Sequence, residues 1–199
     1  MVGINRDANR RATVRTLVTP AARCRSVELG SFCFSLAMID GLEGGCACGL
    51  VRYRLASGPL IVHCCHCLNC QRQTGSAFAI NLMIEADRVE VLNGEPRPVE
   101  VARDDGGVQR VFRCHSCQVA VFSEYGWPEL LYVRGGTLDE PSTAPPDVHI
   151  FTRSKVPWVK LPDGAPAFEI YYDSRTIWPD ASLKRLDVIK ELRAQHESG

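Results

Sequence analysis

The sequence predicts a mainly β protein: a small, zinc-stapled domain of packed antiparallel sheets that ends in a helix. Three observations predict this class. Short apolar stretches separated by turn residues recur from about residue 45 to residue 152. Seven of the ten cysteines fall into three tight groups, as in domains that metal ions hold together. Near the end, apolar residues recur at helical spacing.

The strand signals differ in kind along the chain. Residues 51–55 alternate apolar and polar side chains, as a half-buried strand does. Residues 77–84 are a long apolar run, which indicates a central strand buried on both faces. The stretch 104–107, Asp-Asp-Gly-Gly, predicts a hairpin turn, and residues 135–147, with three prolines, predict an irregular loop. Further strands are expected at residues 60–63, 89–92, 99–102, 108–112, 119–122, 129–134 and 149–152.

The C-terminal helix begins at Asp180 or Ser182, either of which can act as its N-cap. An apolar stripe then predicts one buried face that packs on the sheet, with surface decoration as the alternative. The stripe consists of Leu183, Leu186, Ile189 and Leu192. Trp158 is expected in the core.

We predict one β domain at residues 40–178, followed by the helix and tail at 179–199. Residues 1–37 are expected to be an upstream extension without stable structure, with Met38 as the natural start. A secretory signal and an organelle transit peptide are the alternatives for this leader. The first 25 residues carry six arginines and one acid, so a net charge of −5 is left for the rest of a chain whose total is zero. That balance argues against a nucleic-acid partner.

Cysteine usage points to a reducing compartment. Ten cysteines in 199 residues is about 5%, below the roughly 8–10% of disulfide scaffolds. Metal thiolates persist where thiols stay reduced, which predicts a cytoplasmic protein. Apolar runs stay shorter than the ~18 residues of a membrane span, so no membrane partner is expected.

The cysteine groups predict two zinc ions in different states. They read Cys46-x-Cys48, Cys65-x-Cys67-x2-Cys70 and Cys114-x2-Cys117. On an extended strand, alternate residues point the same way, so the first pair aims both sulfurs at one point. The last pair brackets a tight turn. Together the two pairs supply a closed tetrahedron, which stabilises a fold.

The middle group is left with three sulfurs and an open position, the arrangement of a site that does chemistry. Cys64 could complete a closed four-sulfur site instead, although adjacent residues on an extended chain point to opposite faces. His63 and His66 are candidate ligands too. His66 is expected to face away from the ion, in packing or in a hydrogen bond to a ligand.

These groups stand in a longer pattern. The order C-x-C-G, C-H-C-x2-C-Q-R-x-T-G-S-x-F, F-x-C-x2-C and H-I-F-x-R-S-K-x-P-W occupies residues 46–49, 65–78, 112–117 and 149–158. It resembles the glutathione-dependent formaldehyde-activating enzyme family, which includes centromere protein V. The last cysteine pair in that family is usually followed by glycine, whereas Gln118 stands here. If the turn needs a positive φ, glutamine costs on the order of 1 kcal/mol.

The resemblance implies a β-rich zinc fold, in which Cys46, Cys48, Cys114 and Cys117 hold a structural ion. It further implies that Cys65, Cys67 and Cys70 form the catalytic site, with glutathione as the thiol and S-(hydroxymethyl)glutathione as the product.

The expected activity is that of a carbon–sulfur lyase of the S-(hydroxymethyl)glutathione synthase type. Three thiolates leave a zinc site with a charge of −1, which suits a further sulfur ligand better than water activation. The bound thiolate would attack formaldehyde or a related small electrophile. Arg72 is a candidate for a glutathione carboxylate, with a surface ion pair as its alternative. Thr74, Gly75 and Ser76 would line the pocket. The alternative function is a non-catalytic, zinc-stabilised binding module or glutathione carrier.

Overall fold

The computed structural model describes residues 41–103 and 106–197. The chain divides into two units, residues 1–35 and 36–199, and all described residues belong to the second. The prediction for residues 1–37 therefore lies outside the described residues. No helix in the described part of the chain is long and apolar enough to cross a membrane.

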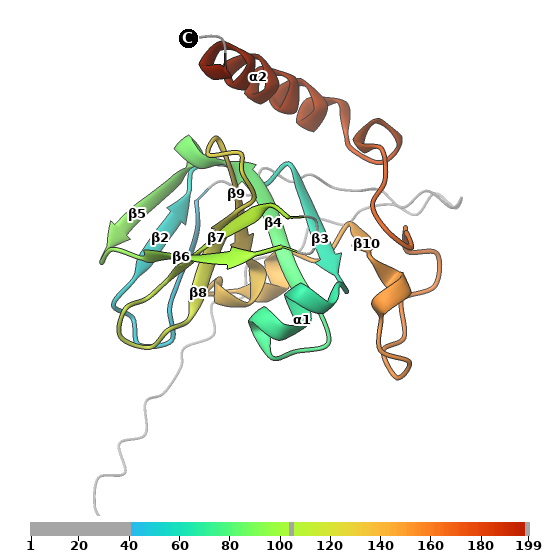
Figure 1. The fold of residues 1–199 in the computed structure, drawn as a ribbon, viewed down its shortest axis with the longest axis horizontal. Helices are drawn as coiled ribbons and strands as arrows, with labels where there is room; N and C mark the ends of the chain where they lie inside the picture. Colours follow the sequence, from blue (N-terminus) through green and yellow to red (C-terminus); the bar gives the residue numbers. More distant parts are fainter. Residues whose placement is uncertain (1–40, 104–105, 198–199) are drawn as a thin grey trace, which may run out of the picture. The chain divides into compact units, whose positions relative to one another are not determined.

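The described residues form two β-sheets and two α-helices, which confirms the mainly β class (Figure 1). The larger sheet has seven strands in the order β10-β3-β4-β9-β8-β7-β6, and the smaller has the order β1-β2-β5. Pairing is antiparallel except for β10, which runs parallel to β3. The strands are β1 Leu42–Gly45, β2 Arg52–Leu55, β3 Ile61–Cys65, β4 Ala79–Glu85, β5 Val89–Asn93, β6 Arg97–Ala102, β7 Val108–Arg113, β8 Ala120–Glu124, β9 Leu130–Arg134 and β10 Val148–Ile150.

Strand β4 is central, as its apolar run predicts, and it separates two hydrophobic clusters. Leu82 and Ile84 pack into one cluster, together with residues of the small sheet. Ala79 and Met83, which alternate with them, pack into the other. Because side chains alternate along a strand, this one segment supplies both cores.

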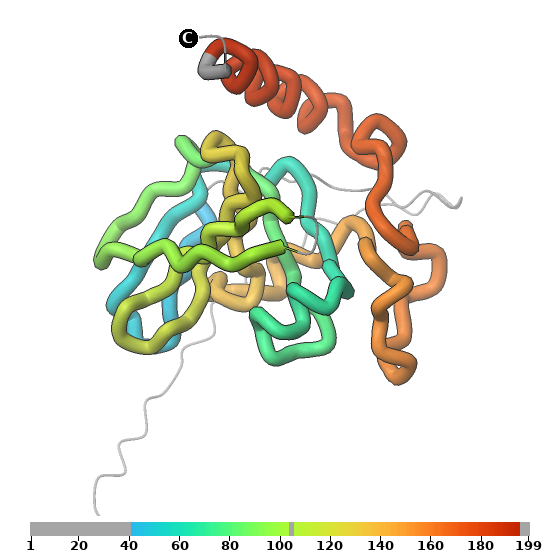
Figure 2. Tube along the Cα trace, viewed as in Figure 1, coloured from blue at the N-terminus to red at the C-terminus, as the bar shows by residue number. Residues whose placement is uncertain are grey.

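The second cluster is completed by the end of the chain. Helix α2, Asp180–Glu197, begins where the sequence predicts and buries Leu186 and Ile189. Leu183 is partly buried and Leu192 remains 44% exposed, so the predicted stripe is fully buried only at its two middle positions. Arg185 donates to both carboxylate oxygens of Glu85 on β4, with Nε to Oε1 at 2.7 Å. The connection from β10 to α2 is irregular apart from short 3-10 turns (Figure 2).

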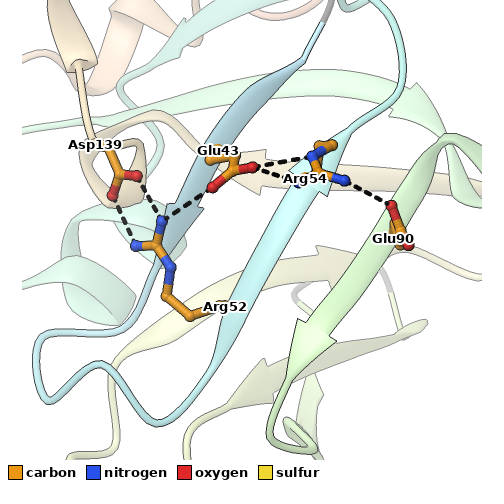
Figure 3. A network of polar contacts seen from close by, with 5 residues as sticks. All are labelled: Glu43, Arg52, Arg54, Glu90 and Asp139. Carbon is orange, nitrogen blue, oxygen red and sulfur yellow. Dashed lines mark hydrogen bonds and ion pairs between the residues drawn. The ribbon is translucent and has the colours of Figure 1, made fainter.

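The loop at 135–147 is irregular, as predicted, and it is tied to the small sheet (Figure 3). Arg52 Nη1 donates to Asp139 Oδ1 at 2.7 Å, and Arg54 Nε donates to Glu43 Oε1 at 2.9 Å. On the opposite side of β2, the buried Tyr53 hydroxyl lies 2.7 Å from the Thr137 hydroxyl. The two exposed ion pairs contribute about 0–1 kcal/mol each. The contacts of Asp139 and Thr137 therefore mainly position the loop, whereas the Arg54–Glu43 pair joins β2 to β1.

Three expectations need correction. Cys46 and Cys48 lie in the turn after β1 and not on a strand, because the chain reverses there to pair β1 with β2. The helix α1, Leu68–Thr74, was not expected, since its cysteine and glutamines give no apolar stripe. Trp158 is 74% exposed and does not belong to the core, because it follows the irregular turn after β10.

Candidate metal centres

Cys46, Cys48, Cys114 and Cys117 converge as the sequence predicts. Their sulfur atoms all lie within 4.8 Å of one another, with Cys46 Sγ and Cys48 Sγ 3.5 Å apart and Cys48 Sγ and Cys114 Sγ 3.7 Å apart. Four thiolates on one tetrahedral Zn²⁺ at 2.3 Å lie roughly 3.8 Å from one another. The four side chains therefore fit such an ion with little rearrangement.

The first half of this four-cysteine site is a turn stabilised by its own backbone. Cys46 N donates to Val51 O at 3.0 Å, and Gly49, at φ +76°, donates to Cys46 O at 3.0 Å. Glycine adopts this left-handed conformation without the strain that a Cβ would add. Val51 N also donates to Cys46 Sγ at 3.2 Å, a contact that favours the thiolate.

The second half of the four-cysteine site is the turn after β7. Gln118 lies in this turn with a φ of +62°, a positive value that glycine would adopt without strain. Gln118 N donates to Cys114 O at 3.0 Å, and its side-chain Nε2 donates to His115 O at 2.9 Å, which partly offsets the strain. The backbone N–H groups of Val119 and Cys48 lower the pKa of Cys117 to about 6, so this thiol is readily ionised.

Cys65, Cys67 and Cys70 form a second, separate cluster with sulfur atoms within 4.8 Å of one another. Cys65 ends β3, Cys67 is the N-cap of α1, and Cys70 lies in the first turn of that helix. Cys67 Sγ accepts from Cys70 N at 3.3 Å. Cys65 and Cys70 are buried, whereas Cys67 is partly exposed, so Cys67 is the open side of the cluster.

Ionisation within the three-cysteine cluster is unequal. Hydrogen bonds from the Cys65 and Cys70 thiols lower the pKa of Cys67 to about 2. Hydrogen bonds with Cys67 and Cys70, together with burial, raise the pKa of Cys65. One thiolate is therefore present at neutral pH before any ion binds. A metal ion is required to ionise the other two.

Cys64 does not join this cluster, so the closed four-sulfur alternative is wrong. Its Sγ lies 3.5 Å from His66 Nε2, which in turn lies 3.1 Å from His149 Nδ1, and all three residues are buried. The two rings are stacked with centroids 5.4 Å apart, and the nitrogen separation fits a hydrogen bond between them. The three ligand atoms also lie within 4.8 Å of one another, so this buried set is a further group that could hold an ion. His66 faces away from the cluster, as expected. His63 also has a partner elsewhere, the Tyr172 hydroxyl at 2.8 Å.

Side chains of α1 tie the cluster to distant strands. Gln71 Nε2 donates to the carbonyls of His66, at 2.8 Å, and Ser154, at 2.9 Å. Asn69 Nδ2 donates to Gln109 Oε1 on β7 at 2.9 Å. The two hydrogen bonds of Gln71 therefore connect the cysteine motif to the H-I-F-x-R-S-K motif.

The four residues predicted to contact substrate lie at the end of α1. Thr74 Oγ1 donates to Cys70 O at 2.8 Å, and Gly75, at φ +64°, ends the helix by donating its N–H to Gln71 O at 2.8 Å. Arg72 and Ser76 are exposed. Thr74 lines an open hollow of about 470 Å³, together with Arg113, Cys117 and Arg134.

Arg134 is the polar residue near the cluster that sequence reasoning missed. It is 5% exposed, at the end of β9, and its Nη1 donates to Asn81 Oδ1 on β4. Its Nε and Nη2 are buried without a hydrogen-bond partner. The signal that could have found it is an arginine at the end of an otherwise apolar run, residues 130–134.

Comparison with known proteins agrees with the pattern of the cysteines. The profile described as "Glutathione-dependent formaldehyde-activating enzyme" matches residues 41–154, more than half of the chain. The chain belongs to the glutathione-dependent formaldehyde-activating enzyme family. The matched residues contain all seven clustered cysteines of this family member and end before α2.

A curated relative of this family member comes from Halomonas elongata and is named "Putative glutathione-dependent formaldehyde-activating enzyme". It is 34% identical over 127 residues, which cover 60% of this chain and 80% of the relative. A crystal structure of a Rhodobacter sphaeroides protein is 21% identical, with a TM-score of 0.39 over 49% of this chain and 88% of that chain. A likeness this distant adds nothing to the assignment.

Proposed function

We propose that this protein is a zinc-dependent carbon–sulfur lyase that adds a small thiol, glutathione, to formaldehyde or a related small electrophile and catalyses the reverse cleavage. One observation carries the proposal: the described residues build two thiol clusters, one of four sulfurs and one of three. Four sulfurs complete a tetrahedron, whereas three leave one position for a substrate. The family's name supplies the thiol and the electrophile.

In this proposal the two clusters have different roles. Cys46, Cys48, Cys114 and Cys117 hold a structural Zn²⁺ that joins the turns after β1 and β7. Cys65, Cys67 and Cys70 hold the catalytic ion. When bound there, zinc would supply a soft, electron-rich centre that favours the deprotonated form of a thiol.

The chain's own residues orient the reaction. Burial of Cys65 and Cys70 closes the cluster from inside, so a thiol approaches from the side of Cys67. Arg72 would bind a carboxylate of glutathione, and Thr74 and Ser76 would contact its polar groups. Gly75 would contribute by its lack of a side chain, because its N–H already donates to Gln71 O. The thiolate sulfur attacks the carbonyl carbon, and the oxygen takes up one proton to give the hydroxymethyl thioether.

We further propose the domain limits 40–178 for the catalytic β domain and 179–199 for the helix and tail. A reducing, cytoplasmic setting follows from the use of cysteine as a metal ligand. Neither a membrane nor a nucleic acid is part of the proposed function.

The test measures exchange between ¹³C-formaldehyde and S-(hydroxymethyl)glutathione by NMR, because the addition also proceeds without catalyst. The zinc-loaded protein should accelerate exchange above the protein-free rate, and Cys67→Ser should return it to that rate. Cys64→Ser is the matched control, because the Cys64 side chain lies on the opposite face of β3 from the cluster. Its exchange rate should equal that of the natural protein. Undiminished exchange in Cys67→Ser would contradict the proposal. Glutathione binding without acceleration would support the carrier function in its place.

A further inference from the structure

Arg134 has a buried positive charge that no described carboxylate neutralises. Its side chain makes one hydrogen bond, to the neutral amide of Asn81, and its Nε and Nη2 have no partner. A buried cation costs several kcal/mol unless an anion lies close to it. An anion other than a carboxylate side chain is therefore expected close to Arg134.

The strand register places Arg134 on the same face of the sheet as the three-cysteine cluster. Cys65 pairs with Ala79 and His63 with Asn81, across β3 and β4, and Asn81 pairs with Arg134 across β4 and β9. Directly paired residues share a face, and so do residues two apart on one strand. Cys65, Asn81 and Arg134 thus lie on one face, which α1 covers with Cys70.

The electrostatics agree with this placement. Burial raises the pKa of Tyr125, a charge on Cys70 raises it further, and the charge of Arg134 lowers it. Arg134 and Cys70 therefore both lie close enough to Tyr125 to act on its hydroxyl.

Charge arithmetic shows what Arg134 changes. Three thiolates and one Zn²⁺ have a net charge of −1, and a thiolate as a fourth ligand brings it to −2. Counting the guanidinium of Arg134 on the same face of the sheet, these totals become 0 and −1. A buried site of charge −2 is strongly unfavourable, so a neighbouring cation favours the uptake of an anionic ligand over a neutral one.

We propose that Arg134 is the internal counter-charge of the three-cysteine metal site and the residue that allows this site to accept an anionic thiolate. The inference rests on the proposed function for the identity of the thiol. It makes Arg134 a positioning and charge-compensating residue, since it acts through the cluster and not on the reacting atoms.

The first experiment measures zinc affinity by chelator competition in Arg134→Met and Arg134→Lys. Arg134→Met should weaken the three-cysteine site 10–100-fold, the range seen when groups that support metal ligands are removed. The four-cysteine site of the same molecule is the internal control and should retain its ion with unchanged affinity. Arg134→Lys keeps the charge and should restore most of the affinity. Equal affinity in Arg134→Met and the natural protein, equal weakening in Lys and Met, or weakening at both sites would each overturn the proposal.

The second experiment separates charge compensation from direct substrate binding and from a folding role. The cobalt-loaded protein is titrated with 2-mercaptoethanol, which has no carboxylate, and with neutral imidazole, and the visible spectrum is followed. Arg134→Met should weaken 2-mercaptoethanol binding at least 10-fold and leave imidazole binding within about 2-fold. A loss confined to glutathione would show that Arg134 binds the substrate carboxylate and would overturn the proposal. None of these measurements requires turnover, so failure of the proposed reaction would leave them interpretable.

Discussion

Cys64 and Cys65 are neighbours in the chain, yet their side chains lie on opposite faces of β3. Cys64 contacts His66 Nε2 in one direction, whereas Cys65 joins Cys67 and Cys70 in the other. The alternation of a strand assigns the two cysteines to separate side-chain groups. This single relationship divides the dense cysteine motif into two chemically distinct parts.

The first prediction follows from that division. Cys65→Ala should remove one equivalent of zinc per chain, measured by elemental analysis of protein purified under reducing conditions. Cys64→Ala should retain two equivalents, because its sulfur lies among buried imidazoles. Loss of zinc from Cys64→Ala would mean that the Cys64, His66 and His149 set also holds an ion.

The second prediction concerns the four-cysteine site. Cys114→Ala should greatly lower the stability of the domain, since a structural zinc site contributes on the order of 10 kcal/mol in small zinc domains. Circular dichroism and thermal melting would detect the loss. Cys67→Ser is the comparison: it should lose its ion and its activity but keep the β fold. Equal stability of the two variants would argue against a structural role for the first site.

The third prediction uses the strained turn. Gln118→Gly should be more stable than its matched control Gln118→Ala by about 1 kcal/mol in urea unfolding. Both variants lose the side-chain hydrogen bond to His115 O, but only glycine adopts φ +62° without strain. If alanine and glycine behaved alike, the left-handed conformation would not be the cause.

The fourth prediction concerns the attachment of α2. Glu85 is 8% exposed and receives hydrogen bonds from Arg185. Burial raises the pKa of Glu85, but the Arg185 hydrogen bond and charge outweigh it and lower the pKa overall. The folded state therefore releases this proton more readily than the unfolded state, so the stabilisation is complete above pH of about 4.5 and declines as the pH falls below it.

The measurement compares the free energy of unfolding of Glu85→Gln and the natural protein across pH. At pH 7 the variant should be roughly 2 kcal/mol less stable, and the difference should shrink towards pH 3. Arg185→Met should give the same pH dependence. A difference that stays constant down to pH 3 would contradict the assignment.

The sequence predicts the strands where one signal dominates. The apolar run of β4 allows no other reading, and α2 has both a cap and a stripe. The sequence does not predict α1, because the helix depends on Cys67 as a cap, on the contact of Asn69 with β7 and on that of Gln71 with the turn at Ser154. Such contacts have no local pattern in the sequence.

The candidate site likewise contains residues that the sequence predicts and residues that it does not. Spacing predicts which sulfurs lie together within each cysteine group, because each group is local in the chain. The convergence of Cys48 on Cys114, 66 residues apart, depends on the fold. Arg134 is 64 residues beyond Cys70 in the chain, and only the pairing of β3, β4 and β9 puts it on their face. Trp158 was misplaced for the converse reason: its apolar character predicts burial, but no strand or helix carries it inward.

The sulfur of Cys67 performs two tasks at one atom. It accepts the hydrogen bond that starts α1, and it is the most accessible member of the three-cysteine cluster. Within this cluster an alkylating or oxidising reagent would therefore reach Cys67 first and remove a helix cap along with a metal ligand. Modification of Cys67 would therefore destabilise α1, the helix that carries Arg72 and Thr74. The proposed substrate-binding residues would then lose their positions as well.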